Sequence, residues 1–270
     1  MGATGRIGFS ADANYRGEGI SLGLARGLLA EINGVNLTQE GMGIGAIACR
    51  HAGFTWFSRD SRTETLGEGF YRKWYSLDSR VIWQLAGRQS RLFTRFLEAG
   101  ADAYMKVPGL QVPLMVFGTF LRKLFRVRAR FVPAAPIASA VFDYTVRGDR
   151  VDVACAVEGP AGLPSRIFVM NELGADFFCR GLDRERAIEP PSGWQPIAPG
   201  LSTPVLYDPA HRLRFSVDRL FVDPVVPARI FWGRERFSEY CWAGFEFQLD
   251  LGRFRGKSIA FTYSVLVEQG

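Results

Sequence analysis

Residues 140–157 read AVFDYTVRGDRVDVACAV, and this stretch decides the fold class of the chain. Apolar and polar side chains alternate over residues 140–146 and again over 151–157, around the turn sequence 147–150. A period of two is typical of strands with one buried face, and the short turn between them predicts an antiparallel hairpin. Similar runs, separated by turn residues, occur at 166–178, 211–221, 242–251 and 258–267. We therefore expect an antiparallel sheet that is curved or barrel-like.

Residues 20–58 are rich in glycine and carry two further turn signals. Asn33-Gly34 separates two apolar runs, and His51-Ala52-Gly53 precedes the apolar run that begins at Phe54. Asn-Gly between such runs is the strongest short signal for a hairpin. Residues 22–32 also fit one face of a helix that ends at Asn33-Gly34. Strands are favoured because internal glycines weaken a helix, and the helix stays an open alternative.

The apolar period changes to that of a helix between residues 77 and 130. Asp78 can cap a first helix, and Pro113 can begin a second one after the turn at Pro108-Gly109. Both helices are predicted to be amphipathic, with basic residues on the outer face: Arg80, Arg88, Arg91 and Arg95 on the first, and Arg122, Lys123 and Arg126 on the second. The predicted fold class is therefore α+β: one domain over residues 1–270, with this basic helical pair inserted into the sheet.

Composition excludes several classes of protein. Of the 270 residues, 47% are hydrophobic and 22% are charged, which is the range of globular proteins and excludes a disordered chain. The net charge of +6 is local, because residues 76–135 hold ten arginines or lysines against three acidic residues. A solvated face is the simplest interpretation of this local charge. Its alternatives are an anionic membrane surface or an acidic protein partner, whereas nucleic acid is disfavoured because no binding module is recognisable.

No metal, cofactor or membrane span is expected. The four cysteines are far apart within apolar runs and are interpreted as free thiols, and the chain has only two histidines. The longest uncharged apolar stretch, residues 107–121, has 15 residues and contains two prolines, which is too short to cross a bilayer. The N-terminus lacks the pattern of a secretion signal, so a cytoplasmic location is expected, with peripheral membrane contact through the basic helices as an extension.

A binding surface for an apolar ligand is predicted near the first strands. Gly41, Gly43 and Gly45 recur at every second position, so a flat apolar molecule or another part of the backbone can approach closely. The chain also contains 22 Phe, 8 Tyr and 6 Trp, which is a high aromatic content. Trp56 and Phe178 are the aromatic residues assigned to this ligand site.

Acidic residues inside apolar strands are the candidate catalytic groups, because a buried carboxyl stays protonated and can donate a proton. Asp143 and Asp176 are the main candidates for the acid, and His51, at the end of a predicted strand, is a candidate partner. Glu172 and Glu246 belong to the same class of candidate. The alternation of the strands equally allows each of these acids to point to solvent.

No strong catalytic motif stands in the chain, so three functions remain open. The first is binding of an apolar small molecule, lipid or isoprenoid-like, in an aromatic-rich β cavity. The second is an acid/base enzyme acting on such a substrate, namely a hydratase, isomerase or cyclase. The third is a scaffold whose basic helices bind an acidic partner. The sequence does not indicate an oligomeric state.

Overall fold

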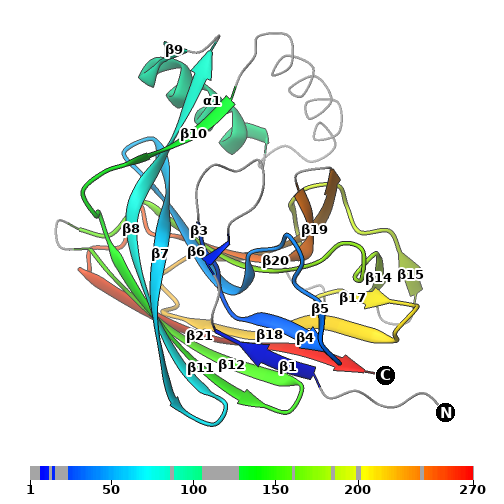
Figure 1. Ribbon diagram of the computed structural model, residues 1–270. Coiled ribbons are helices and arrows are strands. Elements are labelled where there is room, and N and C mark those ends of the chain that lie inside the picture. The colour runs from blue at the N-terminus through cyan, green and yellow to red at the C-terminus, as the bar shows by residue number, and fades with distance from the viewer. Residues whose placement is uncertain are drawn as a thin grey trace.

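The computed structural model describes most of the chain (Figure 1). The described residues are 7–11, 14–15, 24–85, 88–104, 128–159, 162–183, 186–198, 202–237 and 240–269. Structural statements below concern these residues.

Within the described residues, sixteen strands form one antiparallel sheet. In chain order they are β6 (Gly43–His51), β7 (Phe54–Gly67), β8 (Phe70–Leu85), β9 (Arg88–Gln89), β10 (Arg128–Pro133), β11 (Ser139–Arg147), β12 (Arg150–Glu158), β13 (Arg166–Leu173), β14 (Arg180–Asp183), β15 (Arg186–Ile188), β16 (Gln195–Pro196), β17 (Val205–Asp208), β18 (Leu213–Val222), β19 (Ala228–Phe237), β20 (Tyr240–Asp250) and β21 (Ser258–Gln269). Two small antiparallel sheets precede it along the chain. They are formed by β1 (Ile7–Ser10), β4 (Leu29–Ile32) and β5 (Val35–Asn36), and by β2 (Asn14–Tyr15) and β3 (Leu24–Ala25).

The large sheet folds over on itself around an aromatic core. Its pairing order is β15-β14-β17-β18-β21-β12-β11-β8-β7-β6-β13-β20-β19-β16, so six strands separate β21 from β20. Even so, the rings of Tyr263 on β21 and Phe247 on β20 lie 4.8 Å apart, and those of Phe215 on β18 and Phe245 on β20 lie 5.2 Å apart. These edge-to-face contacts join the two halves of the sheet across the core. One half comprises β18, β21, β12 and β11, and the other comprises β6, β13 and β20.

The predicted strands and turns of the second half of the chain are confirmed. Burial alternates along β12 and along most of β21, with the apolar positions in the core, as expected for a strand with one buried face. The turn at residues 147–150 joins β11 to β12 in the predicted antiparallel register, in which Val146 pairs with Val151. The hairpin 140–157 is therefore formed as predicted.

The strand interpretation of residues 22–32 is confirmed over the described part, residues 24–32. These residues form β3, a bridge from Leu28 to Ile44, and β4. Asn33 and Gly34 have φ values of 51° and 79°, and they turn β4 back onto β5. Positive φ at both central residues is the geometry of the tight hairpin turn for which Asn-Gly is preferred.

The prediction of an α+β fold with a pair of amphipathic helices is wrong. Residues 77–85, assigned to the first helix, belong to β8, where Leu77 and Val81 are buried. The helical spacing of Ile82 and Leu85 is overridden by strand pairing, because β8 gains partners on both sides from β7, β11 and β10. The described residues contain one helix, α1 (Arg91–Tyr104), and the second predicted helix lies outside them.

The expected barrel-like closure is also wrong. In the part of the chain that the structure describes, the pairing order is open, with β15 at one end and β16 at the other. The sheet buries its apolar side by folding one half onto the other, and this needs no hydrogen bonds between the two end strands.

Helix α1 lies at the end of β8 that is remote from the pairing with β11 (Figure 1). Ser90 precedes the helix and its Oγ accepts a hydrogen bond from the Phe93 amide at 3.2 Å, as an N-cap does. The Oγ1 atom of Thr94 accepts a hydrogen bond from the Trp83 amide of β8 at 2.9 Å. The expected apolar face is not buried, because Leu92 and Phe96 are 81% and 74% exposed. A buried threonine therefore docks α1 on β8.

Two further features concern membrane-spanning helices and the cysteines. No described helix has the length and apolar character needed to cross a membrane. All four cysteines are free thiols, as expected; Cys49 and Cys155 are buried, and Cys179 and Cys241 are partly buried.

Candidate functional site

Two glutamates share one face of the sheet, on the side of β13 and β20 turned away from the aromatic core. Met170 of β13 pairs with Glu246 of β20, and Glu172 pairs with Gly244, in a regular antiparallel register. Glu172 and Glu246 are therefore diagonal neighbours, since paired residues and those two positions along a strand share a face. Both are buried, with 6% and 7% of their surface exposed. We call this surface the acid face.

Glu172 is buried with limited compensation of its charge. Its Oε2 accepts a hydrogen bond from the Met42 amide at 2.9 Å. Burial raises the pKa of Glu172 to about 7; the Met42 hydrogen bond and the charge of Arg26 oppose this shift, and the charge of Glu235 adds to it. A carboxyl with this pKa exists in both protonation states near neutral pH.

Glu246 is the more strongly shifted of the two acids. Its Oε1 accepts a hydrogen bond from Nε2 of Gln248 at 2.6 Å. Burial raises the pKa of Glu246 to about 8; the Gln248 hydrogen bond opposes this, the nearby charge of Glu172 adds to it, and Arg166 lowers it. Glu246 is therefore mostly a neutral carboxylic acid at neutral pH, beside a second acid that is partly ionised.

Apolar side chains occupy the same face. Ala46 of β6 pairs with Met170, which itself pairs with Glu246, so the three lie in one row. Ala46, Ala48 and Met170 form a small buried cluster separate from the main core, and three partly buried apolar residues pack against it: Met42, Phe57 and Phe168. The two carboxyls therefore border an apolar surface, which is an environment that favours their neutral form.

Two buried cations hold the segment around β3 in place. The guanidinium of Arg26 donates hydrogen bonds to the carbonyl oxygens of Gln39 at 2.6 Å and Gly41 at 2.9 Å. The fully buried Lys73 ammonium donates to the carbonyl oxygens of Arg26 at 2.8 Å and Ala11 at 3.0 Å. Burial lowers the pKa of Arg26 to about 10, and the charge of Glu172 opposes this. Arg26 therefore links the β3 segment electrostatically to the acid face.

The glycines predicted to contact a ligand are packed closely by other parts of the chain. An added Cβ atom would lie 2.7 Å from the Glu172 carbonyl oxygen at Gly41 and 2.5 Å from the Leu28 carbonyl oxygen at Gly43. At Gly45 it would lie 2.7 Å from the Tyr144 hydroxyl. These glycines serve close packing, which was the alternative interpretation of their spacing.

Trp56 and Phe178, the aromatic residues predicted for the ligand site, belong to the main core. Both are buried, and the ring of Phe178 lies 5.4 Å from that of Phe215. Their assignment to an apolar ligand stays a prediction.

The other predicted catalytic residues lie apart from the acid face. Asp143 on β11 accepts two hydrogen bonds from Arg72 at 2.5 and 2.8 Å, and its side chain is 43% exposed. Asp176, between β13 and β14, pairs with Arg236 at 3.0 Å and is 45% exposed. His51 ends β6, and its carbonyl oxygen accepts a hydrogen bond from Trp56 Nε1 at 3.3 Å. Their catalytic roles stay predictions.

The predicted basic residues are only partly described. Arg80 lies on β8, and its guanidinium carbon is 5.3 Å from the centre of the Phe54 ring; that of Arg95 on α1 is 5.8 Å from the same ring. Arg88 and Arg91 are described only in their backbone, in β9 and α1. The remaining basic candidates lie outside the described residues: Arg122, Lys123 and Arg126.

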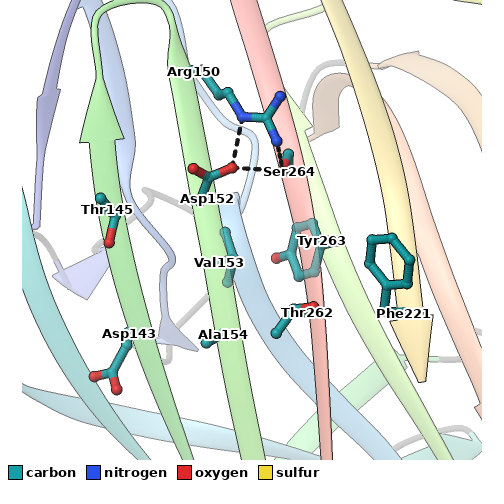
Figure 2. A pocket seen from close by; sticks show the side chains of 10 residues that line it. All are labelled: Asp143, Thr145, Arg150, Asp152, Val153, Ala154, Phe221, Thr262, Tyr263 and Ser264. Atoms are coloured by element: carbon teal, nitrogen blue, oxygen red, sulfur yellow. Dashed lines mark hydrogen bonds and ion pairs between the residues drawn. The ribbon is translucent and has the colours of Figure 1, made fainter. Parts of the chain in front are cut away.

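A groove of about 290 Å³ lies on the side of the molecule opposite to the acid face. It is formed on the outer surface of β11, β12, β21 and β18 (Figure 2). Its lining residues are Asp143, Thr145, Arg150, Asp152, Val153, Ala154, Phe221, Thr262, Tyr263 and Ser264. Val153 and Tyr263 are core residues, so the other eight supply the outward side chains. We call this feature the outer groove.

A polar network closes one end of the outer groove (Figure 2). Asp152 Oδ1 accepts hydrogen bonds from Arg150 Nε at 2.6 Å and from Ser264 Oγ at 2.7 Å, and Arg150 Nη2 donates to Ser264 Oγ at 2.6 Å. Although partial burial alone would raise it, these bonds and the charges of Arg150 and Arg147 hold the pKa of Asp152 below its usual value. Asp152 is therefore a fixed, ionised acceptor.

Sequence reasoning found the two glutamates as candidates but ranked them below Asp176, and it missed the outer groove except for Asp143. The sequence contains only part of the information that would have indicated the groove. Thr145, Asp152 and Thr262 stand at outward positions of alternating strands, but nothing local indicates that these strands are neighbours.

Comparisons with known proteins give little guidance. No known protein family matches the sequence, and no curated protein matches it. The crystal structure of the Slr1438 protein from Synechocystis sp. PCC 6803 is 9% identical, covers 92% of this chain and 89% of its own, and superposes with a TM-score of 0.40. This similarity is too low to support any transfer of fold or function.

Proposed function

We propose that the acid face binds an apolar small molecule and catalyses proton transfer to it, as an acid/base isomerase does. The observation that carries this proposal is the position of Glu172 and Glu246 as buried diagonal neighbours on one face, beside the cluster of Ala46, Ala48 and Met170. Titratable groups with strongly shifted pKa values cluster at functional sites, where catalysis needs them.

The two acids differ in the way that an acid/base pair requires. Glu246, with a pKa of about 8, holds its proton at neutral pH, whereas Glu172, with a pKa of about 7, is partly ionised. In the proposed reaction, Glu246 gives its proton to one carbon of a substrate double bond. Glu172 then takes a proton from a neighbouring carbon, so the double bond moves and the total number of protons is unchanged. Proton exchange with solvent restores the starting states of both carboxyls.

The surroundings favour an uncharged substrate without strong polar groups. A charged molecule would lose its hydration beside Ala46, Ala48 and Met170 without gaining a partner there. Lipids and isoprenoids satisfy this condition, and their double bonds accept a proton. The same protonation step could begin a hydration or a cyclisation.

Deuterium incorporation tests this proposal. The protein is incubated in deuterated water with geraniol or citral, two small isoprenoids, and the mass of the recovered compound is measured. We expect the native protein to exchange carbon-bound hydrogen for deuterium in at least one probe. Glu246→Gln should slow the exchange by about 100-fold or more, because general acid catalysis contributes at least that factor.

Further variants make the result specific. Glu158→Gln, at an exposed position of β12, is the matched control and should leave the exchange unchanged. Loss of exchange in Asp176→Asn but not in Glu172→Gln or Glu246→Gln would assign the chemistry to the other predicted acid and overturn the proposal. Binding of a probe with no exchange in any protein would indicate a carrier instead.

A second candidate function, peripheral binding to an anionic membrane, is favoured by the surface of α1. Leu92 and Phe96 are one turn apart and strongly exposed, and the exposed Arg95 stands beside them. Exposed apolar side chains next to a basic one are typical of helices that lie in the interface of a membrane. The cytoplasmic location expected from the sequence stays a prediction.

Vesicle sedimentation tests the membrane proposal. We expect the protein to sediment with vesicles that contain phosphatidylglycerol and to remain in solution with vesicles of phosphatidylcholine alone. The double variant Leu92→Ser and Phe96→Ser should lose this binding without loss of fold, since both side chains are exposed. Equal sedimentation of this variant and the native protein would exclude α1 as the contact.

A further inference from the structure

We propose that the outer groove is a binding site for one ring of a neutral sugar. The groove is separate from the acid face, because it lies on the outer side of β11, β12, β21 and β18, whereas the acid face belongs to the other half of the folded sheet. The proposal therefore does not depend on the proposed chemistry.

The register of the strands sets the shape of the groove. Five residues from five neighbouring strands stand in one row across the sheet: Arg72, Asp143, Ala154, Thr262 and Phe221. Ala154 and Thr262 are short, exposed side chains, and they form the floor between Asp143 on one side and Phe221 on the other (Figure 2). Three strand spacings separate Asp143 from Phe221, which is about 14 Å between their backbones. After the space taken by these two side chains, this width leaves room for a single ring.

A distortion of β18 presents the aromatic wall. The pairing of β18 with β21 shifts register between Asp218 and Phe221, and Phe221 is 63% exposed. Such irregularities re-aim side chains and are common beside binding sites. The face of the Phe221 ring offers a partly negative surface to the C–H groups of a sugar ring.

The polar lining supplies acceptors and donors in fixed positions. The Oδ2 atom of Asp152 has Arg147 at 3.8 Å, so it can still accept a close hydrogen bond. Asp143 is held by both hydrogen bonds of Arg72, and each of its oxygens retains a lone pair. Thr145 and Thr262 add hydroxyl groups that donate and accept.

The charge balance favours a neutral ligand. Asp143 is paired with Arg72, and Asp152 is paired with Arg150 and more distantly with Arg147, so neither carboxylate of the lining is an unpaired charge. An anion or a cation would have to compete with one of these ion pairs. A molecule with several hydroxyl groups can instead donate to the two carboxylates while its apolar face lies on Phe221. This combination of polar edge and apolar face describes a sugar ring in its cyclic form.

Saturation-transfer NMR with D-glucose, D-galactose and D-mannose tests this proposal, and glucose 6-phosphate serves as a charged probe. We expect transfer from the protein to the ring hydrogens of at least one neutral sugar. Phe221→Ala should weaken the binding about 3- to 10-fold, which is the range expected for the loss of one aromatic contact. Ala154→Leu should abolish it, because the larger side chain fills the floor of the groove.

Ala156→Leu is the matched control for Ala154→Leu. Ala156 is the next outward, exposed position of β12 and does not line the groove, so this variant should bind as the native protein does. Three results would overturn the proposal: no transfer to any of the three sugars, equal transfer to native protein and Ala154→Leu, or binding of glucose 6-phosphate alone.

Discussion

Tyr263 on β21 donates its hydroxyl hydrogen to Oδ1 of Asn171 on β13, 3.1 Å away, and so joins the two halves of the sheet across the aromatic core. The same oxygen accepts the Gly45 amide of β6 at 3.1 Å. Asn171 is fully buried, and burial raises the pKa of the Tyr263 hydroxyl far above its usual value. The Tyr144 hydroxyl of β11 donates to the Gly45 carbonyl oxygen of β6 at 3.2 Å, so buried hydroxyl groups join the two halves at more than one point.

Removal of this contact should weaken the packing of the two halves. Tyr263→Phe removes one hydrogen bond and is expected to lower the free energy of unfolding by about 1 kcal/mol, as measured by urea denaturation. Asn171→Ala should cost more, about 2 to 3 kcal/mol, because it also leaves the Gly45 amide and the Tyr263 hydroxyl buried without a partner. If the loss in the double variant equalled the sum of the two single losses, the two residues would not be coupled.

The stability of the protein should fall as pH rises through the range in which its buried acids ionise. Glu172 and Glu246 have pKa values of about 7 and about 8 in the folded state, against an ordinary value of 4.5. Above pH 4.5 the unfolded chain loses these protons while the folded chain retains them, so stability decreases up to about pH 8 and then levels off. The loss for Glu172 alone is on the order of 3 kcal/mol. Unfolding free energies measured at pH 5 and pH 8 should differ accordingly.

Neutral isosteres should remove this pH dependence. Each of Glu172→Gln and Glu246→Gln is expected to remove part of the slope, and the double variant should flatten the profile, because the amide does not ionise. Glu158→Gln, at an exposed position, should give the profile of the native protein. A native profile that is already flat between pH 5 and pH 8 would contradict the assigned shifts.

The two acids should also titrate as a coupled pair. The charge of Glu172 contributes to the raised pKa of Glu246. Glu172→Gln is therefore expected to lower the pKa of Glu246, measured from the chemical shift of its ¹³C-labelled carboxyl. An unchanged titration of Glu246 in this variant would show that the two groups do not interact.

Gly45 should tolerate a side chain less well than Gly148, although both glycines have a positive φ. Gly45 has a φ of 78°, and an added methyl group would displace the Tyr144 hydroxyl, which donates to the Gly45 carbonyl oxygen at 3.2 Å. Gly148 has a φ of 62° but open space around it, so Gly148→Ala measures the cost of a positive φ without any steric clash. We expect Gly148→Ala to cost about 1 kcal/mol and Gly45→Ala about 1 to 3 kcal/mol more in thermal or urea unfolding. Equal losses would show that Tyr144 moves away freely.

Thr94 should control the docking of α1. Thr94→Val keeps the shape of the side chain but removes the oxygen that accepts the Trp83 amide. The Trp83 amide is then expected to exchange with deuterated solvent faster, by about fivefold, since one hydrogen bond contributes about 1 kcal/mol. Ser90→Ala, which removes the N-cap, should instead speed exchange within the first turn of α1. Identical exchange at Trp83 in native and Thr94→Val proteins would disprove this docking contact.

Much of the secondary structure could be predicted from the sequence because its signals are local. The alternation on either side of residues 147–150 and the Asn33-Gly34 turn depend only on neighbours along the chain, and both were predicted correctly. Residues 78–85 were misassigned because their local apolar spacing favoured a helix. The partners that favour the strand come from β7, β10 and β11, which are distant in sequence.

The candidate sites could be predicted only in part, for a related reason. The sequence placed Asp143, Glu172, Asp176 and Glu246 in apolar stretches, and it could not tell which of them would be buried. Local alternation indicates that an acid shares a face with its neighbours two positions away, but which faces become enclosed is set by how the halves of the sheet fold together. The sequence by itself therefore determined most of the strands of the second half of the chain, the tight turns and the list of candidate acids. The tertiary structure alone decided that Glu172 and Glu246 are buried together and that Asp143, Ala154, Thr262 and Phe221 meet in one row, because both arrangements depend on pairings between strands that are far apart in the chain.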